Sequence, residues 1–154
     1  MEQEYSATDI GIIPKDWTIL TFDDAFKFLS TATYSREKLS NNKKVSYIHY
    51  GDIHTKMNTF LDFEKIDLPT IDDNMVKSYP FIKEGDLIIV DASEDYEGVS
   101  KSVEVKNIKL IKAISGLHTF LLRPKKDFFV NGFKIVKIYL DAELSSPPFN
   151  LVPN

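Results

Sequence analysis

The chain has 154 residues, of which 43% are hydrophobic and 27% charged, values typical of one globular domain with its own core. It contains no cysteine, which excludes disulfide scaffolds and thiolate metal sites. It also lacks the ~18–20-residue apolar run of a membrane-spanning helix and the apolar core of a secretory signal, so we expect a cytoplasmic protein.

The net charge of −4 is unusual for a nucleic-acid binder, but the charges are unevenly distributed. Residues 34–56 carry five cations against two anions, and residues 101–137 carry nine cations against two anions. Between them, residues 57–100 carry eleven anions against three cations. If the fold brings the two basic blocks to one face, a DNA duplex could be held there. The alternative is that both blocks are ordinary solvated surface.

The chain begins with a segment that we expect to be loosely ordered, over residues 1–12. A turn at Pro14 then leads into an apolar strand over residues 18–20, because proline fixes its own backbone and favours an extended residue before it. Trp17, the single tryptophan, is expected to anchor this segment in the core.

A short amphipathic helix is predicted over residues 22–30. Thr21 and Asp24 have the spacing of a capping box, and apolar residues recur at helical intervals after them. The polar, basic residues 31–44 then predict an exposed loop, since Asn41 and its neighbour Asn42 favour a turn.

The rest of the chain predicts mostly strands. Gly51 and Asp52 indicate a turn after the first of them, and residues 72–77 a short helical turn. The apolar run at 87–90 is typical of a strand buried on both faces. The predicted strands cover residues 45–50, 60–63, 87–90, 103–105, 109–111 and 116–124, while 128–140 fits either a helix or a strand. Many strands and few helices predict an α+β domain with a mixed, curved β-sheet and a few short helices.

Four segments, in this order, resemble the target-recognition domains of the specificity (S) subunits of type I restriction–modification systems. They are TDIGIIPKDW at 8–17, YIHYGDI at 47–53, GDLIIVDASEDYEGV at 85–99 and SGLHTFLLRP at 115–124. The third is the most specific of the four. The resemblance implies the fold of such domains, which DNA methyltransferases share. It also implies double-stranded DNA and the methylation and restriction subunits as partners, with no catalytic residue and no cofactor in this chain.

The chain departs from the family pattern in three respects. S subunits carry two recognition domains joined by long helices, whereas this sequence predicts one domain over 1–140 and a flexible tail over 141–154. No sustained heptad pattern follows residue 133, so the chain resembles one half of such a subunit. Ser100 stands where the family's loop more often has a second glycine.

DNA recognition requires cations for phosphates and forked or amide groups for base edges. Arg36 is a candidate for guanine O6/N7, and Asn41 or Asn42 for adenine. An alternative for the whole loop is a solvated surface without DNA contact. The predicted DNA-binding residues are Tyr34, Arg36, Lys38, Asn41, Asn42, Lys43, Lys44, His54, Lys56, Tyr96, Lys101 and Ser102.

A second set of residues is expected to hold the structure. Asp91 and Glu94 in particular are expected to fix the 91–101 loop through hydrogen bonds to backbone N–H groups. The whole set is Pro14, Trp17, Gly51, Asp52, Gly85, Asp86, Asp91, Glu94, Gly98, Gly116, His118 and Arg123.

Two other functions have weaker support in the sequence. The chain could be a half subunit that docks on partner proteins and binds little DNA alone. A small metal-dependent hydrolase would rest on Asp91, Glu94, Asp95 and Glu97, but one loop supplies all four and their spacing does not fit an EF-hand. The three histidines are too scattered to predict a zinc site. The tetrapeptide SPPF at 146–149 resembles a methyltransferase motif but follows no apolar strand, so we treat it as a chance match.

Overall fold

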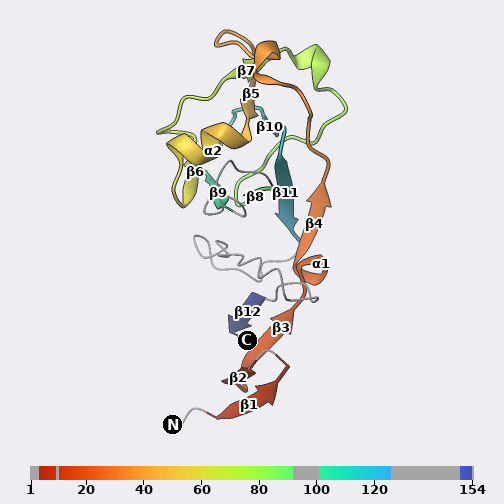
Figure 1. Cartoon of the computed structure of the whole chain (residues 1–154), viewed down its shortest axis with the longest axis vertical. Coiled ribbons are helices and arrows are strands. Elements are labelled where there is room, and N and C mark those ends of the chain that lie inside the picture. The colour runs from red at the N-terminus through yellow and green to blue at the C-terminus, as the bar shows by residue number, and fades with distance from the viewer. Residues whose placement is uncertain (1–3, 10, 92–100, 126–149, 154) are drawn as a thin grey trace.

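The computed structural model describes residues 4–9, 11–91, 101–125 and 150–153. Within these ranges the protein is an α+β domain with a mixed five-stranded sheet, a smaller mixed sheet, two strand pairs and a few short helices, which confirms the predicted fold class. Figure 1 shows an elongated molecule with both chain ends near one pole. No helix among the described residues has the length and apolar character needed to cross a membrane.

The five-stranded sheet has the order β4-β11-β8-β9-β6. Its strands are β4 (Phe26–Leu29), β6 (Phe60–Asp62), β8 (Leu87–Val90), β9 (Ser102–Lys106) and β11 (Thr119–Pro124). Neighbours pair antiparallel except β6 and β9, which are parallel. All four residues of β8 are buried, so the prediction of a central strand covered on both faces is confirmed.

A three-stranded sheet lies at the other pole of the molecule (Figure 1). In it β5 (Val45–Ile48) is flanked by β10 (Ala113–Ser115), which is parallel to it, and by β7 (Thr70–Ile71), which is antiparallel. The predicted strand over 109–111 is wrong: Lys109 has a φ of 46° and Leu110 is 98% exposed, so this segment is a turn before β10.

The pole that carries the chain ends is built from two strand pairs. The hairpin of β1 (Tyr5–Thr8) and β2 (Gly11–Pro14) replaces the expected loose segment, and Gly11 has the positive φ of 118° that its turn requires. The strand β3 (Trp17–Leu20) confirms the predicted apolar strand, and it pairs with β12 (Asn150–Pro153), where the sequence predicted a flexible tail. Trp17 is only half-buried.

The helices are all short. The predicted capping box is present, since Thr21 Oγ1 accepts from the backbone N–H of Asp24 and the Asp24 carboxylate accepts from the backbone N–H of Thr21. The helix it starts, α1 (Phe22–Ala25), has one turn instead of the predicted nine residues, because the chain leaves it to pair with β11 as β4. The other helical segments are η1 (Arg36–Lys38), α2 (Tyr50–Lys56) and η2 (Asp73–Met75), the last of which confirms the predicted helical turn.

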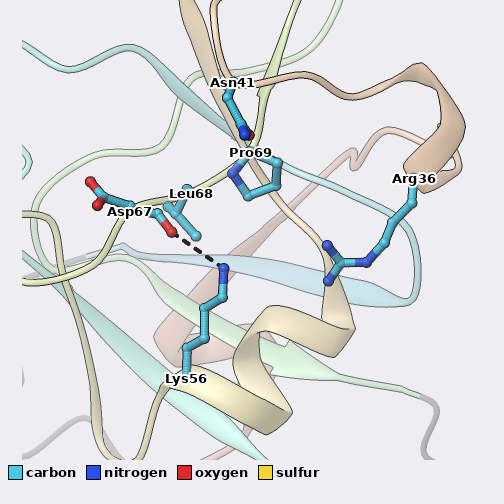
Figure 2. A pocket seen from close by; sticks show the side chains of 6 residues that line it. All are labelled: Arg36, Asn41, Lys56, Asp67, Leu68 and Pro69. Carbon is cyan, nitrogen blue, oxygen red and sulfur yellow. Dashed lines mark hydrogen bonds between the residues drawn. The ribbon is translucent and has the colours of Figure 1, made fainter.

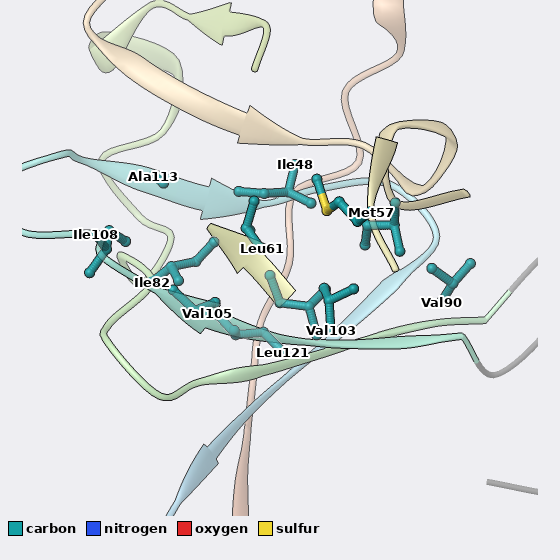
Figure 3. Close-up of a cluster of buried hydrophobic side chains, with 12 residues drawn as sticks. Ile48, Met57, Leu61, Ile82, Val90, Val103, Val105, Ile108, Ala113 and Leu121 are labelled. Atoms are coloured by element: carbon teal, nitrogen blue, oxygen red, sulfur yellow. The ribbon is translucent and has the colours of Figure 1, made fainter. Parts of the chain in front are cut away.

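The largest hydrophobic cluster lies between the two sheets and α2 (Figure 3). Alternate residues of β8 face opposite sides, so Ile88 and Val90 enter this cluster while Leu87 and Ile89 pack against Phe26 and α1 on the other face. Strand β5 contributes Ile48 to the cluster between the sheets, and α2 contributes Ile53. The apolar core therefore fixes the position of α2, and with it the polar residues that α2 presents to the surface.

Candidate nucleic-acid interface

Helix α2 begins directly after β5. The backbone of His49 is extended, and its Nδ1 accepts a hydrogen bond of 3.2 Å from the backbone N–H of Gly51, which caps the first turn. The predicted turn at Gly51 and Asp52 is therefore wrong, because both lie in the first turn of a helix. The side chain of Asp52 consequently lies four residues before Lys56, on the same face of that helix.

Asp52 connects the helix to the basic loop before it. The Asp52 carboxylate is 1% exposed, and it forms ion pairs with Arg36, at 3.1 Å from Nη2 to Oδ2, and with Lys56, at 2.9 Å from Nζ to Oδ1. The two cations are about half-exposed, with 53% and 44% of their side-chain surface accessible. A buried anion thus holds two surface cations at a fixed place.

A cavity of about 460 Å³ lies beside these ion pairs. Figure 2 shows Arg36 and Lys56 pointing into it from the loop and from α2, with Asn41 and Pro69 on its far side. Lys56 Nζ also donates to the backbone oxygen of Asp67, at 3.4 Å. Three of the predicted DNA-binding residues are thereby brought together around one opening.

The loop over residues 34–44 is fixed at both ends. Tyr34 donates a hydrogen bond of 2.9 Å to the backbone oxygen of Met75 and lies edge-on to Tyr79. Ser40 and Thr70 exchange backbone hydrogen bonds of 2.8 and 2.6 Å. Tyr34 is therefore a half-buried anchor, which does not suit the predicted DNA contact.

Between these anchors the loop presents charges and amides to solvent. Its exposed residues include most of the predicted set: Arg36, Lys38, Asn41, Asn42, Lys43 and Lys44. None of Lys38, Lys43 and Lys44 forms a salt bridge with a described residue. These three ammonium groups are available to phosphates.

A cluster of rings borders α2 on its other side. The rings of His49, His54 and His118 surround Tyr50, with centroid distances of 4.5, 6.1 and 5.3 Å. Burial, assisted by the nearby Arg36 cation, lowers the pKa of His49. The neutral form of this imidazole is favoured, which suits its role as the acceptor that caps α2.

The second basic block is only partly gathered on this side of the molecule. Lys101 Nζ donates to the backbone oxygen of His54 at 3.1 Å, so one of its cations does reach α2, and burial lowers the pKa of Lys101. Lys109 pairs with Glu64, and Lys125 lies by Asp23 near α1. Of these three cations only Lys101 lies beside α2, so among them a single basic face is not formed, as the alternative of solvated surface expects.

The remaining predicted DNA-binding residues are either buried or outside the described residues. Ser102 in β9 is 6% exposed, so its side chain is too buried to contact DNA from this position. Tyr96 lies outside the described residues, as do Glu94, Asp95, Glu97 and Gly98. No group of three metal-ligating side chains occurs within the described parts of the chain.

Most of the residues expected to be structural have identifiable contacts. Asp86 is paired with Arg123, and Gly85 before it has a φ of 74°. Asp91 contacts the His118 ring, at 3.2 Å from Oδ1 to Nδ1. At Gly116 an added Cβ would lie 2.2 Å from the Tyr47 ring, so any larger residue would have to displace that ring.

The sequence missed the role of Asp52 as the link between the loop and the helix, and it missed the cavity wall at 67–69. The four-residue spacing of Asp52 and Lys56 was a usable signal, because an acid and a base at that spacing pair on a helix. The contact with Arg36 spans sixteen positions of the chain and leaves no local pattern.

No family model and no curated protein sequence matches the chain. Among solved structures, the chain is similar to the type I restriction–modification S subunit from M. genitalium, with 15% identity and a TM-score of 0.41 over 75% of this chain and 24% of that one. It is also similar to the HsdS subunit from Thermoanaerobacter tengcongensis, with 13% identity and a TM-score of 0.48 over 92% of this chain and 34% of that one. The chain spans about a quarter and a third, respectively, of these two S subunits.

Proposed function

We propose that this chain recognises double-stranded DNA through the surface formed by the 34–44 loop and α2, as the target-recognition part of a type I specificity subunit. The observation that carries the proposal is the convergence of Arg36, Asn41 and Lys56 on one cavity, beside exposed lysines. The four family-like segments of the sequence support it independently. Methylation and cleavage then belong to partner subunits, which the recognition domain directs to its site.

The residues of this surface divide into two kinds by chemistry. Lys38, Lys43 and Lys44 are exposed single charges on flexible stems, which suit phosphates of any sequence. Arg36 and Asn41 offer the planar donor and amide groups that distinguish base edges. A reader of DNA requires both kinds close together, and the 34–44 loop supplies both.

The test is selection of the purified chain against a randomised duplex pool, followed by binding measurements over a range of salt concentrations. We expect enrichment of a short contiguous site and a log affinity that falls linearly with log salt. Replacing Lys38, Lys43 and Lys44 together by alanine should weaken binding to all sequences. It should also make the salt dependence less steep by about 0.9 for each phosphate that is no longer neutralised, so by up to about 3.

The matched control replaces Lys15, Lys65 and Lys109, three exposed lysines that are each paired with a carboxylate elsewhere on the surface. This variant changes the net charge by the same amount and should lose much less affinity. If the two triple variants lose the same affinity, the loss reflects the overall charge of the protein and not the position of the lysines. No binding at low salt would refute recognition of DNA by this chain.

Failure of DNA binding would favour a protein-docking role, for which one observation exists. Phe28 and Phe120 are 53% and 48% exposed. Phe28 lies opposite Leu122 in the β4–β11 ladder, and Phe120 is two residues before Leu122, so both project from the same face of the sheet. Binding of purified methylation subunits that is abolished on replacing both phenylalanines by serine would establish this second candidate.

A further inference from the structure

We infer that the cavity beside α2 receives the edge of a guanine base, that Arg36 reads this edge, and that Asp52 is the positioning residue that fixes the Arg36 guanidinium. The inference rests on the proposed function, DNA recognition by the 34–44 loop and α2. It adds to that proposal the cavity that receives the base edge and a second residue, Asp52, that acts only through Arg36.

The first step is the environment of Asp52. Its carboxylate is 1% exposed, and its two oxygens are the only buried side-chain polar atoms in the described parts of the chain without a well-aligned hydrogen bond. Its compensation consists of the ion pairs with Arg36 and Lys56. Burying a carboxylate costs more than burying an apolar side chain of similar volume, and well-packed apolar residues often replace such pairs without loss of stability. Stability alone therefore does not account for an aspartate here, whereas positioning a functional cation does.

The second step asks which hydrogen-bond donors of Arg36 and Lys56 are not used within the protein. Lys56 is committed, because its ammonium contacts both the Asp52 carboxylate and the backbone oxygen of Asp67. Arg36 is half-exposed, and among described residues its guanidinium is paired with Asp52 alone, through Nη2. A guanidinium carries five N–H donors in a planar fork, so most of them remain available on the side that faces the cavity. Figure 2 shows the Arg36 guanidinium pointing into the space between α2 and Asn41.

The third step distinguishes a base edge from a phosphate. Asp52 cancels one of the two positive charges, which weakens the attraction for a phosphate but holds the fork in one orientation. A phosphate does not need an arginine held in one orientation when flexible cations lie nearby, and the unpaired Lys38, Lys43 and Lys44 can make that contact. Orientation matters greatly for guanine, whose O6 and N7 acceptors must meet two parallel N–H groups.

Gly51 gives an independent indication of the same arrangement. An added Cβ at this position would lie 3.3 Å from Arg36 Nη2 and 3.5 Å from His49 Nδ1. The guanidinium thus rests against the bare backbone of the first turn of α2. Glycine is a poor helix former, and its presence here leaves the space that Arg36 occupies.

The experiment measures discrimination, defined as the affinity for the selected site divided by the affinity for the same site with one base pair changed, at every position in turn. Arg36→Ala should lower discrimination about tenfold at one G·C pair and leave the other positions unchanged. Asp52→Asn should lower discrimination at that same pair by a similar factor, while its affinity for unrelated duplex stays equal or rises, because a negative charge has been removed. Glu4→Gln makes the same charge change in an exposed pair at the far pole of the molecule and should keep discrimination intact.

Gly51→Ala tests the positioning of the Arg36 guanidinium without changing a charge. It also replaces Asp52→Asn as the test if that variant does not fold. It should preserve or raise the melting temperature, since alanine favours the helix, and still lower discrimination at the Arg36 position. If Arg36→Ala instead loses affinity equally for all sequences and its salt dependence becomes shallower, Arg36 contacts a phosphate. That result would overturn the inference but not the proposed function. If Asp52→Asn keeps the discrimination of the wild type, the inference is also overturned, although DNA recognition by this surface stands. If Asp52→Asn does not fold, wild-type discrimination in Gly51→Ala has the same meaning. A wild-type chain that enriches no site would refute the proposed function and the inference together.

Discussion

Arg123→Ala should be among the most destabilising single substitutions in this protein. Its guanidinium donates from Nε to Asp86 Oδ1 at 2.9 Å and from Nη2 to Oδ2 at 2.7 Å. Nη2 also donates to the backbone oxygen of Phe81 at 2.8 Å, and the backbone N–H of Lys83 donates to the same carboxylate at 2.8 Å. Asp86 is 1% exposed, so removing the arginine leaves a buried carboxylate with one backbone donor.

The expected loss is about 3–5 kcal/mol of unfolding free energy, the range for one partner removed from a buried ion pair. For a chain of this size each kcal/mol corresponds to roughly 2–4 °C, so the melting temperature should fall by about 6–20 °C. Urea and thermal unfolding of Arg123→Ala, Asp86→Asn and the double variant form a cycle in which the double variant should lose less than the sum of the two single variants.

The control for this cycle is Lys15→Ala, which breaks an exposed pair with Glu4 whose side chains are 56% and 72% accessible. Such a pair contributes about 0–1 kcal/mol. If Arg123→Ala loses no more stability than Lys15→Ala, the view of Asp86 as a buried charge that depends on Arg123 is refuted.

Two further substitutions test the core and the cap of α2. Gly116→Ala places a Cβ against the buried Tyr47 ring and should cost about 1–3 kcal/mol or more in thermal unfolding; a stability equal to wild type would contradict the close packing. His49→Asn keeps an acceptor for the Gly51 N–H but removes a group whose pKa burial lowers below its ordinary value of about 6.5. Because the unfolded chain protonates His49 first, wild-type stability should fall as the pH drops below about 6.5, and the variant should lose less over that interval; parallel pH profiles would show that His49 is not responsible.

The sequence predicts the fold correctly where a single local residue pattern determines the secondary structure. The apolar run of β8 predicts a strand buried on both faces, and each of its faces does enter a different cluster. The capping box of Thr21 and Asp24 also forms as predicted. The helix after it ends early because Phe26 and Leu29, the second and third residues of the helical apolar spacing, lie in β4, where the backbone pairs with β11 instead.

The candidate site was predicted residue by residue but not as an arrangement. Arg36, Asn41 and Lys56 were each predicted to contact DNA, and the structure brings them to one cavity. The sequence pattern placed Asp52 in a turn, because glycine before it is a turn signal. That glycine lies in a helix whose first turn the His49 ring caps, and its contact with Arg36, fifteen positions earlier in the chain, is not visible to a local pattern.

Asp52 and Asp86, both buried, illustrate how similar ion pairs can serve different purposes. Asp86 is closed: Arg123 is only 24% exposed, contacts it through two parallel hydrogen bonds and also donates to the backbone. Asp52 is open: Arg36 is 53% exposed and touches it with one nitrogen, beside a cavity. A closed pair has its donors satisfied within the protein, so breaking it should appear as reduced stability. An open pair leaves donors for another molecule, so removing the carboxylate should appear first as reduced selectivity for that molecule, and this difference separates a residue that holds the fold from one that positions the reader.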